Sequence, residues 1–423
     1  MRMRSPKQVG LIVAGALAAG ALAACGNNGS NASDSDEIVL GFPAALTGAS
    51  AAYGKPQADA AQMTVDQINA DGGVKELGGK KVKLIVEDTK SDPATTTKII
   101  REMARDGVTA FLGPGPSAEV IASKPLLESL KIPAVTSAVD PTITEDSEYI
   151  FRTLPSITAV TDQAVTYIKS LIDGGTYPDL KNVGILILNQ PPGPAQRPIL
   201  EEGIKALGLN VTVVEYDPSQ VKDFAPILAK FEAANVDLIT GNQYPNDSIL
   251  FAQAVGAQSW RPRDGFFFAG APIYQDAFTK AVGDDALGWT GLAYYKDTTS
   301  DYFTPESNAL SKAFTEKTGL AMDQSSGASG ASAVSLALDA VAAAKSTDPE
   351  KVAAALRTDV KFDDPAGSTF PFYMTPGGVD FDENGNNLAV LSPVVQILAG
   401  GKLAYVYPDE LATADLVPYS KIQ

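Results

Sequence analysis

Short apolar runs alternate with amphipathic segments through the first third of the chain. A run of about four to eight apolar residues is typical of a buried strand, and apolar residues three and four apart are typical of a helix packed on one face. The pattern predicts strands over 38–42, 81–87, 108–112 and 133–136, and helices over 57–70, 93–105 and 117–130. Strands that alternate with helices of this length indicate parallel βαβ units.

The same alternation begins again after a break near 154–158. It predicts strands over 183–188, 211–216, 236–240 and 266–269, and helices over 197–207, 223–234 and 247–257. Two more helices, over 329–344 and 349–357, precede a turn-rich end. A chain of 423 residues is too long for one ordinary core. The sequence therefore predicts an α/β protein with two Rossmann-like, doubly wound lobes.

The predicted strands also indicate where a ligand would bind. Open α/β sheets bind ligands in the crevice at the carboxyl ends of their strands. Two such lobes facing each other would form a cleft lined by loops from both. These loops cover 43–54, 113–117, 136–141, 189–196, 240–247 and 270–274.

The amino terminus has the pattern of an export signal. Arg2, Arg4 and Lys7 precede an uncharged apolar run over 11–23. A mature membrane-spanning helix needs about 20 apolar residues, so this run is too short to be one. Basic residues followed by a short apolar segment predict a secretory signal.

The end of that run, Leu22-Ala23-Ala24-Cys25-Gly26, resembles the lipobox of bacterial lipoproteins, and Cys25 is the only cysteine. The resemblance implies a signal peptide over 1–24 and a lipid on the Cys25 thiol. Acyl chains bury CH₂ groups at about 0.8 kcal/mol each, which would hold the protein on the outer face of the cell membrane. Residues 25–36, without a large apolar side chain, predict a flexible tether. An ordinary cleaved signal with a chance cysteine is the alternative.

Composition excludes several functions. The chain has no histidine, which excludes Ser-His-Asp catalysis and histidine zinc sites. Its formal net charge of −17 argues against nucleic acid as a partner. Residues 380–385 resemble the start of a calcium loop, but Leu391 stands where glutamate is needed, so a tight turn is expected. We therefore expect a non-enzymatic protein without cofactor or metal.

Several motifs are similar to the leucine/isoleucine/valine-binding protein family. Residues 46–54 read LTGASAAYG, 66–73 read DQINADGG, 87–93 read EDTKSDP and 151–153 read FRT. Their order and spacing resemble the family from about residue 38 to 155. The resemblance implies a type I periplasmic binding protein, the solute-binding component of an ABC importer. Expected partners are a small polar solute, such as an amino acid or a related compound, and the permease subunits, and the protein is expected to be a monomer.

The same resemblance implies how the chain divides between the lobes. The amino-terminal lobe would hold 37–155 and 298–388, and the carboxyl-terminal lobe 156–297 and 389–423. Three hinge crossovers would join them, near 154–158, 296–299 and 387–391.

The resemblance implies ligand contacts at Tyr53, Ser117, Ala138 and Tyr244. Ser117 falls where the family binds a carboxylate through a serine hydroxyl. The alternative interpretation of Ser117 is a helix N-cap without a ligand contact. Tyr53 would form an aromatic wall, or else pack within its loop. Ala138 would offer its backbone, and Tyr244 lies near a family tyrosine. We expect Ser117→Ala and Tyr53→Ala to weaken binding with little loss of stability.

Two departures from the family bear on the ligand. Gln190 lies in a loop without the family's aromatic residue, and Ala271 falls where the family has the carboxylate that meets an ammonium group. Because a buried ammonium without a counter-charge is costly, Asp140 or another acid supplies that charge, or the ligand is an amide, a urea-like compound or a carboxylate. Arg197 is a further candidate for a carboxylate, or a solvent-facing helix residue. A sensor working with a partner protein is the alternative class.

Overall fold

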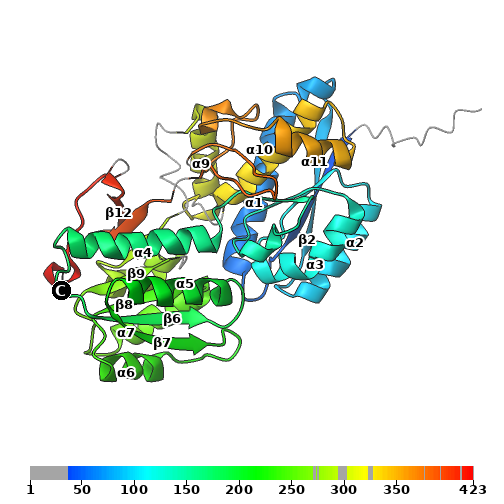
Figure 1. Ribbon diagram of the computed structural model, residues 1–423. Coiled ribbons are helices and arrows are strands. Elements are labelled where there is room, and N and C mark those ends of the chain that lie inside the picture. Colours follow the sequence, from blue (N-terminus) through cyan, green and yellow to red (C-terminus); the bar gives the residue numbers. More distant parts are fainter. Residues whose placement is uncertain are drawn as a thin grey trace, which may run out of the picture. The chain divides into compact units, whose positions relative to one another are not determined.

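The computed structural model describes residues 37–269, 273, 276–293, 303–322, 327–375, 377–390, 392–409 and 412–422. Cys25 and Ala271, and with them the predicted signal, tether and family-acid position, lie outside these residues. Within the described part, the strands form two separate sheets (Figure 1).

The first sheet has five parallel strands in the order β2-β1-β3-β4-β5. They are β1 (Glu37–Ala44), β2 (Lys81–Asp88), β3 (Ala110–Leu112), β4 (Ala134–Thr136) and β5 (Ile150–Arg152). The three short strands β3, β4 and β5 are buried along their whole length, as expected for parallel strands covered on both faces.

The second sheet has seven strands in the order β12-β11-β10-β9-β8-β6-β7. They are β6 (Asn182–Leu188), β7 (Asn210–Tyr216), β8 (Leu238–Asn242), β9 (Gly265–Phe268), β10 (Thr290–Leu292), β11 (Val394–Leu398) and β12 (Lys402–Tyr407). Strand β11 runs antiparallel to both of its neighbours, and the remaining pairs are parallel. The last strands of the chain therefore extend the sheet that β6 begins.

Helices follow most strands, and the eight that periodicity predicts are present, with bounds close to those expected except for an earlier start of the first. The helices are α1 (Ala51–Ala70), α2 (Pro93–Arg105), α3 (Ser117–Leu130), α4 (Ile157–Asp173), α5 (Gly193–Ala206), α6 (Ala225–Ala233), α7 (Pro245–Gly256), α8 (Asp276–Val282), α9 (Pro305–Thr318), α10 (Gly327–Ala344) and α11 (Pro349–Thr358). Local capping sets several of their starts. For example, the Asp92 carboxylate accepts a 2.7 Å hydrogen bond from the N–H of Thr95, just ahead of Pro93 at the first position of α2.

Helix α10 is buried without interruption from Gly327 to Ala342. It packs against α1 and also contacts β3 and β4, so the chain returns to the five-stranded sheet after building most of the other (Figure 1). By length and composition α10 is the one helix among the described residues that could cross a membrane, but 89% of it is buried inside the protein. It is therefore a core helix.

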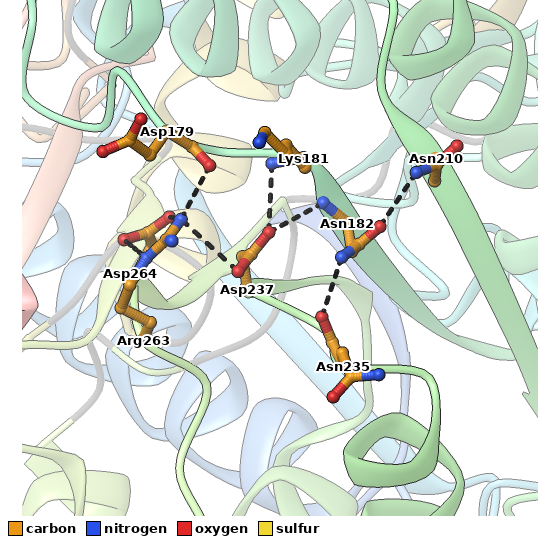
Figure 2. A network of polar contacts seen from close by, with 8 residues as sticks. All are labelled: Asp179, Lys181, Asn182, Asn210, Asn235, Asp237, Arg263 and Asp264. Atoms are coloured by element: carbon orange, nitrogen blue, oxygen red, sulfur yellow. Dashed lines mark hydrogen bonds and ion pairs between the residues drawn. The ribbon is translucent and has the colours of Figure 1, made fainter.

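Polar side chains join the amino ends of the seven-stranded sheet (Figure 2). The Asp237 carboxylate accepts hydrogen bonds from the backbone N–H groups of Lys181, at 3.0 Å, and Asn182, at 2.9 Å. Its other oxygen lies 3.3 Å from the Arg263 guanidinium. These contacts fix the starts of β6, β8 and β9 relative to one another.

The α/β class and the two mostly parallel sheets confirm the prediction. The sequence pattern did not predict α4, α8 or α9, although the buried positions Val160, Ala164, Ile168 and Leu171 of α4 have helical spacing. The expected turn at 380–385 is present, because the Asp382 carboxylate accepts hydrogen bonds from the N–H groups of Asn384 and Asn386. No group of metal-binding side chains occurs among the described residues. The lobe boundaries stay a prediction. Of the three predicted crossovers, 296–299 lies outside the described residues, and so does Leu391 at the end of 387–391.

Candidate ligand-binding site

A cavity of about 100 Å³ lies at the carboxyl ends of strands from both sheets. The segments after β1, β3, β4 and β5 supply Ser50, Tyr53, Gln57, Gly115, Pro116, Ser117, Ser137, Ala138, Val139 and Leu154. The segment after β6 supplies Pro191 and Pro192, and the end of β8 with the segment after it supplies Asn242, Gln243 and Tyr244. The cavity therefore occupies the place where open α/β sheets bind ligands. Four of the predicted contacts line it: Tyr53, Ser117, Ala138 and Tyr244.

Ser117 is the first residue of α3 and is 7% exposed. Its Oγ accepts hydrogen bonds from the N–H groups of Val139, at 3.3 Å, and Asp140, at 3.2 Å. Because a hydroxyl has two acceptor lone pairs and one proton, Ser117 is left with its proton to donate. Pro116, and not Ser117, occupies the N-cap position. Ser117 thus holds the β4 loop and can present a donor to a ligand.

Tyr53 lies in the first turn of α1, whereas the sequence placed it in a loop before the helix. Gln57, one turn further along the same helix, also lines the cavity, and sequence analysis did not select it. Its Nε2 donates a 3.2 Å hydrogen bond to Ser137 Oγ. The spacing of four residues between Tyr53 and Gln57 puts both on one face of α1 and was a usable signal.

The loop that leads to Tyr53 is held by Asp88 at the end of β2. Its Oδ1 accepts from the N–H groups of Leu46, Thr47 and Lys90 at 2.9 to 3.1 Å, and its Oδ2 from the Thr47 hydroxyl at 2.7 Å. Partial burial by itself would raise the pKa of Asp88, but these hydrogen bonds together outweigh it and lower the pKa. The charged carboxylate is therefore the form that fixes this loop.

Tyr244 follows β8 and forms the opposite wall. Its hydroxyl donates a 2.7 Å hydrogen bond to the carbonyl oxygen of Pro191. Burial, with a smaller effect from the negative charge of Asp247, raises the pKa of Tyr244. Burial also raises the pKa of Asp247 to about 6. The hydrogen bond that Asp247 accepts from the Tyr216 hydroxyl, at 3.0 Å, lowers this pKa by less than burial raises it. Tyr244 thus stays protonated and holds the loop after β6.

Three other predicted residues lie elsewhere. The Asp140 carboxylate accepts from the N–H and hydroxyl of Thr142, at 3.0 and 2.6 Å, and Asp140 does not line the cavity. Gln190 also does not line it, and its Nε2 lies 3.4 Å from Asp217 Oδ1. Arg197 faces solvent and pairs with Glu215 at 2.7 Å, as its second interpretation predicts. Ala271 lies outside the described residues.

Sequence analysis also missed Gln243, which lines the cavity between β8 and α7. Its side chain is 1% exposed, and neither its Oε1 nor its Nε2 has a hydrogen-bond partner. It lies within the predicted loop 240–247, in which the family resemblance points to the neighbouring Tyr244. No lining side chain in the described part of the chain is charged, so the cavity offers neutral donors and acceptors.

The chain matches the model of the family described as Periplasmic binding protein over residues 37–402. It is 27% identical over 390 residues to the Leu/Ile/Val-binding protein homolog 8 of Brucella abortus (strain 2308), covering 90% of this chain and 93% of the relative. The fold is similar to that of LivJ, the branched-chain amino acid transporter substrate binding protein of Streptococcus pneumoniae, in complex with isoleucine. That match has a TM-score of 0.71 and 19% identity, covering 87% of this chain and 97% of the other.

A second similar structure is a solute binding protein of an ABC transporter from Rhodopseudomonas palustris BisB5, in complex with 3,4-dihydroxy benzoic acid. It has a TM-score of 0.73 and 20% identity, and the match covers 90% of this chain and 98% of the other. At this identity both structures bear on the fold alone. The match over 37–402, the named relative and the two-sheet fold confirm the resemblance found in the sequence: the chain belongs to the periplasmic binding protein family.

Proposed function

We propose that this protein is the receptor of an ABC importer, which captures a small polar solute, such as an amino acid or an amide, in its cavity and delivers it to a permease. The observation that carries the proposal is the cavity at the carboxyl ends of strands from both sheets, with Ser117 on one side and Tyr244 on the other. Family membership and the names of its relatives support it. No catalytic step is part of the proposal.

The two-sided lining suggests how binding would be signalled. A ligand that contacts both sheets binds one relative arrangement of them better than others, and it shifts the population toward that arrangement. The permease would recognise that arrangement. The lobes would divide at 37–155 with 298–388 and at 156–297 with 389–423, joined by crossovers near 154–158, 296–299 and 387–391.

The location belongs to the same proposal. Family membership places the protein outside the cytoplasm. Lipid attachment at Cys25 would keep the receptor at the membrane, close to the permease, in place of free diffusion.

The test is uptake by the bacterium that encodes the chain. We expect deletion of the gene to abolish uptake of the solute that binds the purified protein, and the wild-type gene to restore it. Cys25→Ser, which removes the thiol and leaves the binding residues intact, should restore less. Unchanged uptake in the deletion strain, together with intact binding, would contradict an import role and favour a sensor.

A further inference from the structure

Gln243 lines the cavity with a buried side-chain amide that has no hydrogen-bond partner. It lies between the end of β8 at Asn242 and the start of α7 at Pro245, and its side chain is 1% exposed. Both amide atoms are without a hydrogen-bond partner, although the residue lines a cavity built of polar and apolar groups. A primary amide can donate two hydrogen bonds and accept two.

Such a group lowers the stability of the folded protein. Burial of a polar group without a partner costs free energy, and nearly all buried side-chain polar groups in folded proteins are paired. An apolar residue of similar size, such as leucine, would remove that cost. Retention of an unpaired amide at the wall of a cavity is what a ligand contact requires, because the ligand supplies the missing partners.

The lack of charged side chains in the described lining of the cavity restricts the chemistry of that ligand. Among the described residues, the cavity is lined by hydroxyl, amide, aromatic and aliphatic side chains and by no acid or base. Asp140, which the sequence offered as a counter-charge, has its carboxylate bound by Thr142. Among the described residues, an ammonium or a carboxylate moved from water into this site would meet no opposite charge in direct contact, whereas an uncharged polar group has less hydration to lose.

The hydrogen-bonding pattern restricts it further. Ser117 has both acceptor positions occupied by backbone N–H groups, so it meets the ligand as a donor. Gln243 can donate through Nε2 and accept through Oε1 side by side. A carboxamide or ureido group offers the complement, a carbonyl acceptor next to an N–H donor. A cavity of about 100 Å³ suits a small molecule, since a 150 Å³ cavity in another protein binds benzene.

We propose that Gln243 is a specificity-determining residue that selects ligands carrying an uncharged carboxamide or ureido group. This proposal rests on the solute-binding function proposed above and names the chemical class of its ligand. Of the ligands that the sequence left open, it favours the amide alternative over an amino acid.

Titration calorimetry on the full-length protein purified in detergent tests it with matched probes. Isobutyramide and isobutyrate have the same shape and differ in the neutral NH₂ and the charged oxygen, and L-valine carries both a carboxylate and an ammonium group on a skeleton one carbon longer. Acetamide and urea serve as smaller amides. We expect binding of at least one amide and at least tenfold weaker binding of isobutyrate and L-valine.

Two variants assign the effect to Gln243. Gln243→Leu should weaken amide binding at least tenfold and, unlike a merely disruptive change, should raise the melting temperature of the ligand-free protein. Gln253→Leu, the same change at an exposed position of α7, should alter neither. Unchanged amide binding in Gln243→Leu overturns the proposal.

Failure of this proposal is distinguishable from failure of the proposed function. Binding of L-valine but of no amide would overturn the ligand class and leave a solute receptor in place. Binding of none of these probes would also overturn the ligand class, and a broad solute panel would then decide the function separately.

Discussion

The hydroxyl of Tyr244 donates a 2.7 Å hydrogen bond to the carbonyl oxygen of Pro191, and both residues line the cavity. One residue follows β8 and the other follows β6, so the bond joins two neighbouring loops of the seven-stranded sheet. It fixes the ring of Tyr244 as a wall and leaves the hydroxyl proton with Pro191. Tyr244 therefore contributes shape to the site more than hydrogen bonding to a ligand.

Tyr244→Phe should consequently have a small effect on binding. It removes one hydrogen bond, worth about 1 kcal/mol, so we expect the dissociation constant of the bound solute to rise about fivefold. Tyr244→Ala removes the wall and should weaken binding by more than tenfold. Calorimetry of both variants checks this, and a Tyr244→Phe variant as weak as Tyr244→Ala would mean that the hydroxyl contacts the ligand.

Ser117→Ala should weaken solute binding and also destabilise the protein. The sequence alone suggested little loss of stability, but Ser117 Oγ accepts from the N–H groups of Val139 and Asp140. Loss of that acceptor should lower the free energy of unfolding by about 1 to 2 kcal/mol, as read from chemical denaturation. Ser117→Thr keeps the hydroxyl and is the matched control. Equal stability of the alanine variant and the wild type would contradict this account of the β4 loop.

Asp339 should make stability depend on pH. It is 6% exposed on α10, and it accepts hydrogen bonds from the Ser368 hydroxyl, at 2.7 Å, and the N–H of Thr369, at 2.8 Å. Burial, only partly offset by these bonds, raises the pKa of Asp339 to about 7. The folded state therefore binds this proton more tightly than the unfolded state, so the contribution to stability is present at low pH and is lost as the pH rises toward 7.

The corresponding variant is Asp339→Asn, which cannot ionise. Between pH 5 and pH 8 the free energy of unfolding of the wild type should fall relative to this variant by up to about 3 kcal/mol. Chemical denaturation of the two proteins at both pH values measures the difference, because other titrating groups are common to both. Parallel pH profiles would show that the Asp339 carboxyl ionises normally in the folded protein.

Asp237→Ala should lower the stability of the protein without weakening solute binding. Asp237 joins the amino ends of the strands (Figure 2), whereas the cavity lies at the carboxyl ends. Loss of its bonds to Lys181, Asn182 and Arg263 should lower the free energy of unfolding by about 2 kcal/mol. The dissociation constant of the bound solute should stay within twofold of the wild-type value. A tenfold loss of affinity would mean that the two ends of the sheet are coupled.

The parts of the fold that follow from burial were predictable. Strands covered on both faces read as continuous apolar runs, and β6 and β8 were found for that reason. The start of α1 was not found, because Gly54 and Pro56, both poor helix formers, lie inside its first turns. The same error placed Tyr53 in a loop.

The place of the cavity was predictable, but its chemistry was not. Five of the six predicted loops contribute to its lining, yet a sequence does not show which polar side chains are already paired. Asp140 is followed two residues later by Thr142, which binds its carboxylate in a local turn. Gln243 is one residue from Tyr244, and only its burial without a partner sets it apart.

The most direct test of a solute-binding function is the melting temperature of the full-length protein against a panel of amino acids, amides, urea analogues, carboxylates and sugars. A ligand of the folded state raises stability by RT ln(1 + [L]/Kd), about 4 kcal/mol for a micromolar binder at millimolar concentration. We expect a saturable rise of several degrees with at least one small polar solute, and a smaller rise in Ser117→Ala and Tyr53→Ala. No rise with any solute of the panel would contradict it.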